Sequence, residues 1–551
     1  RSNAPPDSVE EFQVLTSQFN AEFGNASGLV LNTITRSGTN TLQGRGYYFH
    51  RDQGMDARNA FATSKARFEQ KQGGGWLGGP IIKDRTHFFG SVEITRRTTV
   101  ATVNAVVEQG DVKQPFRNEN ALVKITHQLT PMHRLAGRFS VDRPLEKKQG
   151  VGGLNTSGRG IDYQTTDYAY VGTLTSILSD RALNEFRFQY SDAGIDIQVD
   201  DPEGFTINRP GSNIGKPANQ PQAIPEVRYQ FVDNFSYELG AHRLKFGTDI
   251  SHITSDGYLY QNNPGVFTFT TDRPFDPADL STYPVSFLKN EGDVTFKFTN
   301  TNVSLFAQDA WRVHQTLTLN VGVRYDMYRI TGADMDAFNL APRLGVAWDP
   351  FGTGKTTVRG GFGVFYNSIM FNVPIFTAFF ANQRSILINS PGFPDPYSRP
   401  GTPGTVPIST YRAEGDDQAV PRTYSVTIGM QRELAPGLAV SADYVNSRSR
   451  KLIRIVEKNP TLPPAFLRED PTRGFIRELQ STGYSDYQAV WVGINKRFAN
   501  RGQVGAAYTL SSGKTTNEAE NGLYSMDDRD PDDAYGYNGN DERHRLVAQL
   551  Y

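Results

Sequence analysis

The sequence predicts an all-β protein, a large antiparallel transmembrane β-barrel, on three observations. Apolar and polar residues alternate with a period of two in segments of about ten residues, the length that a tilted strand needs to cross a bilayer. About 17 to 19 such segments follow one another, too many for one ordinary sandwich. Their connections alternate between short turns and long polar stretches, an asymmetry typical of outer-membrane barrels.

Composition excludes several other classes of protein. The chain has 551 residues, 37% of them hydrophobic, with 52 glycines, 35 phenylalanines and no cysteine. No stretch reaches the roughly 18 apolar residues of a transmembrane helix, whereas barrel strands expose only every second side chain to lipid. The formal net charge of -1 predicts no nucleic-acid partner. The lack of cysteine excludes disulfides and thiolate metal sites.

The first 50 residues predict a small element that leads into a sheet. Two strand-like apolar pieces, at 12–15 and 29–34, are separated by a turn region at Gly24 and Gly28. The polar linker 36–40 follows, before alternation starts at residues 46–49.

The clearest strand is predicted at residues 317–326. One face carries Leu317, Leu319, Val321, Val323 and Tyr325, and the other carries Thr318, Asn320, Gly322, Arg324 and Asp326. A water-soluble sandwich would give the same alternation with the apolar face turned inward. The pattern therefore predicts strands, and it leaves the surrounding medium open.

Further strands and their connections complete the predicted barrel. Similar alternation marks the segments 185–190, 244–249, 423–431, 438–444 and 504–510. Short turns are predicted at 313–316, 433–437 and 499–502, and long outside loops at 197–225, 257–290, 367–420, 453–485 and 513–541. Aromatic residues near strand ends fit interfacial girdles or ordinary strand aromatics: Trp311, Tyr325, Trp348, Tyr366, Tyr444 and Tyr508.

Several motifs, in order along the chain, resemble those of one family. They are AEFGNASGLVLNTITRSGTN at 21–40, DARN at 56–59, LGGPIIKDRTHFF at 77–89, and the segments 306–312, 317–325, 341–350, 357–366, 483–489, 508–511 and 541–545. Together they resemble the Oar-like branch of TonB-dependent outer-membrane receptors. The resemblance implies that residues 1–40 are the C-terminal end of a plug domain. Residues 41–551 would then be a barrel truncated at its C-terminus, with about 17 to 19 of the family's 22 strands.

The resemblance also implies a function. External loops would bind an unidentified ligand, which would cross a plugged barrel in the Gram-negative outer membrane, in contact with its lipid. The TonB–ExbB–ExbD complex would act through an N-terminal region outside this chain. Two alternatives stay open: a surface adhesion or interaction barrel that transports nothing, and an outer-membrane hydrolase with a Ser/His/acid cluster at the rim.

No motif supports a catalytic, cofactor or metal site. The run 352–357 resembles a phosphate loop, but Asp349 stands where the first glycine should be and strand residues follow, so a hairpin turn is predicted. The acidic loop 527–541 lacks the EF-hand pattern, which favours a solvated loop over a calcium site. The eight histidines form no HExxH motif and there is no GxSxG elbow.

Five inward charges are predicted to line a wet lumen: Glu185, Arg187, Lys245, Arg324 and Arg359. They could pair with one another or with the plug, or they could act on a passing solute. The sequence leaves both roles open.

Overall fold

The structure is a computed structural model of the chain. It describes residues 5–551 except 17–19, 59, 61–64, 332–336, 369–374, 376–378, 380–382, 400–401, 405–409, 414–418, 463–466, 472–473, 475, 499–501 and 517–533. Among the described residues, no helix is long and apolar enough to cross a membrane. The acidic residues 527–533 and Asn59 lie outside the described part.

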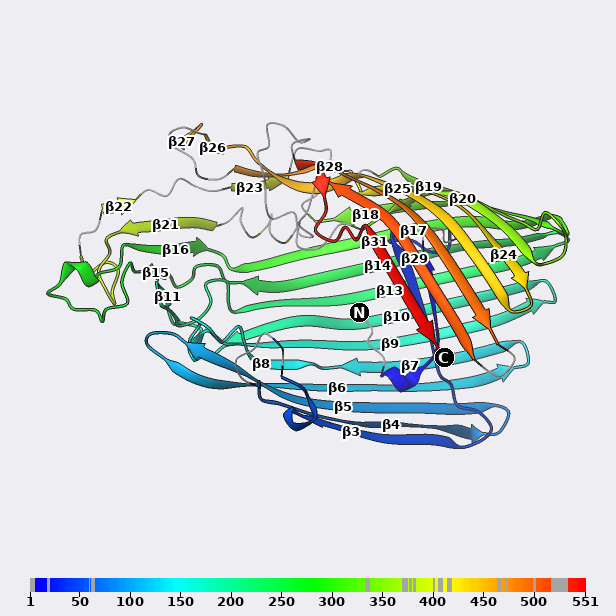
Figure 1. Ribbon diagram of the computed structural model, residues 1–551, viewed down its shortest axis with the longest axis horizontal. Coiled ribbons are helices and arrows are strands. Elements are labelled where there is room, and N and C mark those ends of the chain that lie inside the picture. Colours follow the sequence, from blue (N-terminus) through cyan, green and yellow to red (C-terminus); the bar gives the residue numbers. More distant parts are fainter. Residues whose placement is uncertain are drawn as a thin grey trace.

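One antiparallel sheet curls into a barrel (Figure 1). Its long strands, in chain order, are β3 (Gln43–Asp52), β4 (Phe68–Ile82), β5 (Thr86–Asn104), β6 (Gln109–Thr130), β7 (His133–Asp142), β9 (Ile161–Ser179), β10 (Ala182–Val199), β13 (Gln222–Leu239), β14 (His242–Leu259), β17 (Thr295–His314), β18 (Leu317–Ile330), β19 (Asn339–Trp348), β20 (Thr356–Tyr366), β24 (Arg422–Ala435), β25 (Leu438–Glu457), β28 (Ile476–Arg497), β29 (Gln503–Thr515) and β31 (His544–Leu550).

These eighteen strands, counted in the described part of the chain, each pair with the next one along. The count lies within the predicted range of about 17 to 19. Three short strands add to the sheet: β8 (Leu145–Gln149), β23 (Thr410–Ala413) and β30 (Gly536–Tyr537). Among the described pairings, β3 contacts only β4 and β31 contacts only β29. An all-β barrel is therefore confirmed.

The two rims of the barrel differ as predicted. The hairpins β17/β18 and β24/β25 close through short turns at one rim, shown at the right of Figure 1. The turn between β19 and β20 also lies there, and the Asp349 carboxylate accepts a hydrogen bond from the Gly354 N–H at 2.6 Å. The run 352–357 is thus a hairpin turn. The long connections all leave the opposite rim.

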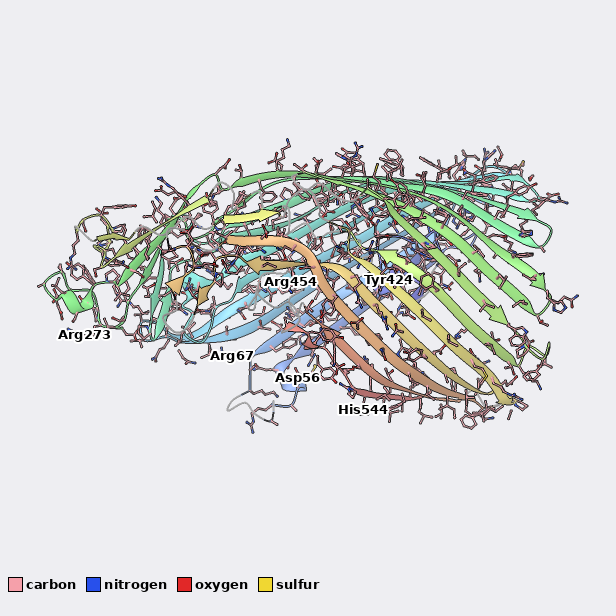
Figure 2. All side chains as sticks on the ribbon, turned by 90° about the horizontal axis from the view of Figure 1, so that it is seen from above. Asp56, Arg67, Arg273, Tyr424, Arg454 and His544 are labelled. Carbon is pink, nitrogen blue, oxygen red and sulfur yellow. The ribbon has the colours of Figure 1, made fainter. Side chains whose placement is uncertain are left out.

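The predicted alternation places apolar side chains outside and polar ones inside. On β18, Val321 is 47% exposed whereas Arg324 is 0% exposed, and the two side chains face opposite sides of the sheet. On β24, Tyr424 and Ile428 are exposed while Ser425 is buried. Figure 2 shows side chains projecting from both faces of the wall, with Tyr424 labelled. The sandwich alternative, with apolar residues inside, is therefore wrong.

Most of the predicted girdle aromatics lie on the outer surface. Those exposed there are Trp311, Trp348, Tyr444 and Tyr508. The expectation for Tyr366 is wrong, because this residue is only 6% exposed. It packs with Tyr328, Val364 and Val420 near the long-loop rim, and Val420 belongs to the connection between β20 and β24.

The long loops build a second sheet beyond the rim, which local patterns did not predict. Its strands are β11 (Thr206–Arg209), β12 (Ser212–Ile214), β15 (Val266–Thr268), β16 (Ser286–Gly292), β21 (Gln383–Asn389) and β22 (Thr402–Gly404). We call it the rim sheet. Figure 1 shows most of its strands at the left end, and Figure 2 places Arg273 at the tip of this projection.

The rim sheet has an aromatic core of its own. Phe267 and Phe287 are fully buried in the connection between β14 and β17, and Phe205, from the connection between β10 and β13, meets both rings edge-on. Nearby, Asp279 caps the short helix η4 (Leu280–Thr282). Hydrogen bonds from Ser281 hold the pKa of Asp279 below its ordinary value. The loop ends are therefore an ordered surface.

A few short elements complete the description. The other single-turn helices are η1 (Pro6–Ser8), η2 (Gln53–Met55) and η3 (Ser157–Arg159). The strands β26 (Thr461–Leu462) and β27 (Leu467–Arg468) form a separate two-stranded pair.

The described residues before β3 include two strands that do not belong to the wall. In the described part of the chain, strands β1 (Val9–Thr16) and β2 (Leu29–Thr35) pair only with each other. The chain then passes Gly38 and enters the wall at β3. A Cβ at Gly38 would overlap the backbone oxygen of Phe88 and lie 2.8 Å from that of Gly79. Only a glycine fits at this crossing without moving the backbone.

We expect Gly38→Ala to lower the free energy of unfolding by roughly 1–3 kcal/mol, since overpacking against backbone forces strand β5 or the linker to shift. Urea unfolding of the detergent-solubilised protein measures this loss. Gly46→Ala on β3 is the matched control, because its Cβ would have nothing within 4 Å. Equal effects of the two substitutions would contradict the tight crossing.

Candidate functional site

Residues 20–27, between β1 and β2, lie against the inner wall of the barrel and are held there by polar side chains. We call these residues the held segment. The side chains that bind it come from four neighbouring strands and the end of a fifth: Lys245, Gln308, Arg324, Tyr328, Arg343 and Asn367. Together with Asp326, which pairs with Arg324, we call them the anchor site.

Arg324 is the centre of the anchor site. Its Nε donates to the Asp326 carboxylate at 2.7 Å, and both side chains are buried. Its Nη1 donates to the backbone oxygens of Ala21 at 3.3 Å and Glu22 at 3.4 Å. The planar guanidinium thus joins a buried ion pair to the backbone of the held segment.

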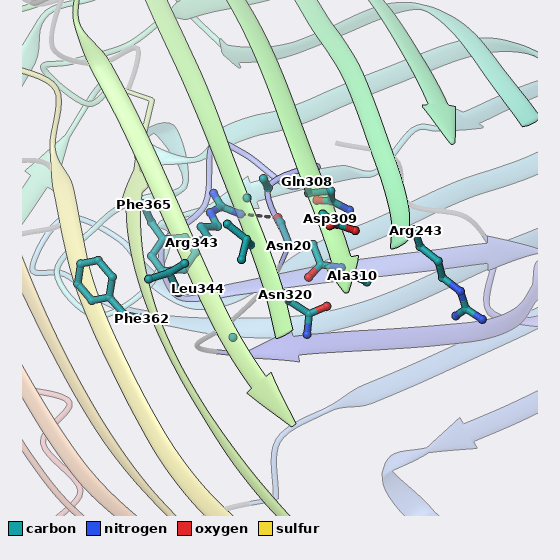
Figure 3. Close-up of a pocket in the computed structure, with 14 residues that line it drawn as sticks. Asn20, Arg243, Gln308, Asp309, Ala310, Asn320, Arg343, Leu344, Phe362 and Phe365 are labelled. Atoms are coloured by element: carbon teal, nitrogen blue, oxygen red, sulfur yellow. Dashed lines mark hydrogen bonds between the residues drawn. The ribbon is translucent and has the colours of Figure 1, made fainter. Parts of the chain in front are cut away.

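Arg343 on β19 binds the same turn from the side. Its Nη1 donates to the backbone oxygen of Phe23 at 2.8 Å and also to that of Asn20, the bond dashed in Figure 3. The guanidinium lies 4.5 Å from the ring centre of Phe365. The Phe365 ring makes a cation–π contact with the guanidinium, and the N–H groups of Arg343 point at the held segment.

Glu22 is bound through both its side chain and its backbone. Its carboxylate pairs with the Lys245 ammonium of β14, and both groups are largely buried. Its N–H donates to the Gln308 side-chain oxygen of β17 at 3.1 Å. This is the ionic contact that ties the held segment to a second part of the wall.

The upper end of the held segment is bound by neutral groups near the long-loop rim. The Tyr328 hydroxyl donates to the Asn25 side-chain oxygen at 2.8 Å, and Asn367 donates to the Ser27 hydroxyl at 2.7 Å. Asn25 has a φ of 55°, a left-handed conformation that asparagine tolerates. The held segment therefore runs along the inner wall from Arg324 and Arg343 toward the long-loop rim.

The end of β2 contacts the opposite side of the wall. Lys124 on β6 donates to the backbone oxygen of Thr35 at 2.9 Å. Arg36 lies 5.2 Å above the ring of Trp76 on β4, and Trp76 stacks on Phe89. Residues 20–40 thus cross the lumen from the strands β14–β20 to the strands β4–β6.

A cavity of about 130 Å³ lies beside the held segment (Figure 3). Its lining includes Asn20, Ala21, Gln308, Asn320, Arg343 and Phe365. The amide and guanidinium groups of the lining can bind water. The cavity also leaves room for a small displacement of the held segment.

The arrangement holds a segment and is suited to releasing it. Every contact described above is a hydrogen bond, an ion pair or a ring contact, and water can replace the hydrogen bonds when the segment moves. Within the described residues, no group of three or more His, Asp or Glu side chains could hold a metal ion. The site therefore supports reversible attachment.

Three of the five predicted inward charges have partners. Arg324 pairs with Asp326, Lys245 with Glu22, and Arg359 with Asp443 in a two-bond contact at 2.9 and 2.7 Å. Glu185 and Arg187 are absent from the ion pairs among described residues and touch no part of the anchor site.

Sequence reasoning missed Arg343, Tyr328 and Asn367. The inward parity of β19 and β18 was a usable signal for the first two. Nothing local distinguishes Asn367, which follows the last residue of β20.

Comparison with known proteins gives consistent matches. The sequence profile of the family described as "Outer membrane beta barrel domain" matches residues 34–114, 108–332 and 328–551. The chain is similar to the TonB-dependent transporter Oar of Myxococcus xanthus, at 22% identity over 92% of this chain and 61% of that protein.

Solved structures with the same fold include two outer-membrane proteins. The outer membrane transporter YddB from Escherichia coli has a TM-score of 0.70 at 13% identity, covering 95% of this chain and 66% of that one. The siderophore receptor PirA from Acinetobacter baumannii has a TM-score of 0.61 at 15% identity, covering 92% and 68%. The chain thus spans less than two thirds of the length of Oar and of YddB.

Proposed function

This chain belongs to the family of outer membrane beta barrel domains, and from that premise we propose that it transports a ligand through a plugged barrel, driven by TonB. Its location is the Gram-negative outer membrane. The relatives are named as transporters and receptors, in agreement with the prediction that the chain is not an enzyme.

In this proposal residues 1–40 are the C-terminal end of the plug and residues 41–551 belong to the barrel. The observation that supports it best is the held segment, which lies inside the lumen and is bound to the wall by polar contacts. An apolar interface would resist separation in water, whereas a polar one can be rehydrated. A plug held in this way can be rearranged by a pulling force.

The remaining parts of the proposal concern partners. The TonB–ExbB–ExbD complex supplies the pull, through a region N-terminal to the plug end. The rim sheet and its neighbouring loops bind the ligand. The free sides of β3 and β31 pair with further strands in the whole protein, because lipid offers no hydrogen-bond partner to a strand edge.

The test uses the absence of cysteine from this sequence. Within the full-length gene product, Ser27→Cys places a thiol where Asn367 now binds the segment. We expect its labelling by a membrane-impermeant maleimide to rise at least several-fold when the TonB system is energised, and to fall after a protonophore. Val107→Cys, on an exposed loop tip, should label equally in both states.

Labelling of Ser27→Cys that is the same with and without the TonB system would contradict the transport proposal. That result would favour the alternative, a surface interaction barrel. The rim sheet supports this second candidate, because its buried aromatic core gives a preformed surface that needs no plug movement to bind a partner. Recovery of the full-length protein in the cytosol would contradict both.

A further inference from the structure

Four cationic side chains gather on the inner wall, away from the anchor site. We call them the cationic patch: Lys124 on β6, Arg134 and Arg138 on β7, and Arg187 on β10. Lys124 lies directly opposite Arg138 in the β6–β7 ladder. Arg187 faces Thr173 of β9, which in turn faces Ala136, between the two arginines of β7.

These positions bring the four charges close together. Two strand spacings separate Arg187 from β7, which is roughly 10 Å between backbones and within reach of two extended arginines. Arg138 and Arg134 both act electrostatically on Lys124, and Arg187 acts on Arg138. The four groups therefore share one local field.

No carboxylate forms an ion pair with the patch in the described part of the chain, although Glu185 lies two residues before Arg187 on the same face of β10 and faces Thr175, which also faces Arg134. None of its four members forms an ion pair there, and the one carboxylate that acts on Lys124 is Glu10 of β1. The Nε of Arg138 is buried and has no hydrogen-bond acceptor. Like charges directly opposed across two strands destabilise the sheet. The repulsion between these cations lowers stability, and no ion pair among the described residues offsets it.

Three other inward cations form ion pairs, and a fourth, Arg343, binds backbone oxygens of the held segment. Arg324, Arg359 and Lys245 each contact a carboxylate. Ion pairs therefore form with some lumenal cations of this barrel, whereas the four cations of the patch form none among the described residues. A group of unpaired cations facing a wet lumen attracts an anion from solution.

The patch lies toward the short-turn rim. Lys124 is near the end of β6, and Arg134 is the second residue of β7. Lys124 also donates to the backbone oxygen of Thr35, so the end of β2 borders the patch. A solute that enters from the loop side would meet these charges in the second half of its passage, after the plug has moved.

We propose that the cationic patch is an anion-binding site for the carboxylate or phosphate groups of solutes that cross the lumen. The inference rests on the proposed transport function and adds a substrate class to it, namely anionic solutes. Arg138 and Arg187 supply planar N–H donors for a carboxylate or phosphate, and Lys124 and Arg134 supply further positive charge.

The test is equilibrium binding of tripolyphosphate, a compact polyanion, to the purified chain in neutral detergent at low ionic strength, followed by calorimetry. We expect binding that weakens as salt is added. The double substitution Arg138→Gln/Arg187→Gln should weaken it at least tenfold. Removing like charges should leave thermal stability unchanged or raise it, which separates lost binding from misfolding.

Arg96→Gln is the matched control. Arg96 is also an arginine opposite another cation, Arg117, but it lies on the exposed outer face of β5. Its substitution should leave the affinity unchanged. The proposal fails if the wild-type chain does not bind, if Arg96→Gln weakens binding as much as the double substitution, or if the double substitution has no effect.

The variant Glu10→Gln distinguishes a binding site for solutes from a contact site for strand β1. If tripolyphosphate binds only after Glu10→Gln, the patch serves as the counter-charge of β1 and the proposal is wrong. Binding that is equal with and without Glu10→Gln supports a solute site. The measurement needs no TonB and no movement, so its failure would leave the result of the Ser27→Cys labelling intact.

Discussion

Arg324→Ala is expected to lower the free energy of unfolding by about 3–5 kcal/mol, because it leaves the Asp326 carboxylate buried without its partner. Asp326 is 2% exposed, so water cannot replace the guanidinium without rearranging the wall. The same substitution removes the donor to the backbone oxygens of Ala21 and Glu22. Urea unfolding of the detergent-solubilised protein measures the effect.

Two further variants make this prediction specific. Lys297→Ala breaks an ion pair with Asp256 in which both side chains are at least 70% exposed, and should cost no more than about 1 kcal/mol. Arg324→Leu/Asp326→Leu removes both buried charges and should recover a large part of the stability lost in Arg324→Ala. A loss in Arg324→Ala no greater than in Lys297→Ala would show that the buried pair contributes little.

A disulfide between Ala21→Cys and Gly322→Cys is expected to abolish the TonB-dependent labelling of Ser27→Cys. A Cβ at Gly322 would lie 3.0 Å from the Cβ of Ala21, whereas disulfides have Cβ separations of about 3.5–4.5 Å, so a shift of about half an ångström suffices. The bond would fix the held segment to β18. Because these 551 residues contain no native cysteine, the reporter thiol at position 27 is the one further thiol here that could compete for the disulfide.

Mass spectrometry of the labelled peptide counts modification at position 27 alone. Oxidation should reduce it to the unenergised level, and a reductant should restore it. Each single cysteine variant, combined with Ser27→Cys, is the control for the substitutions themselves. Labelling that persists at full level in the oxidised protein would show that residues 20–27 need not leave β18 during the energised movement.

Most of the fold prediction rested on the family resemblance and on the alternation of apolar and polar residues. Segments such as 317–326 and 423–431 show their two faces in the sequence, and the structure places the apolar face outside in both. The error at Tyr366 has a physical cause. Alternation reports which face a residue occupies, but it does not report that a loop residue, Val420, packs against the strand end.

The rim sheet was beyond local prediction for a similar reason. Phe267 and Phe287 lie in one connection, Phe205 in a second and Ile388 in a third, and no repeat or spacing connects these stretches. Their burial depends on three loops meeting above the rim. Polar and glycine-rich composition correctly marked these stretches as loops, yet the strands within them form only when the barrel brings their ends together.

By itself the sequence determined which residues form wall strands and which residues share a face, because successive side chains of a strand point to opposite faces whatever lies around them. It also predicted inward positions for Arg187 and Arg324 alike. Only the tertiary structure decided that Arg324 reaches the backbone of Ala21, that Lys245 pairs with Glu22, and that Arg187 forms no ion pair among the described residues. The physical reason is distance: an ion pair requires two charges within a few ångströms, and across a lumen that separation is set by the curvature of the whole sheet.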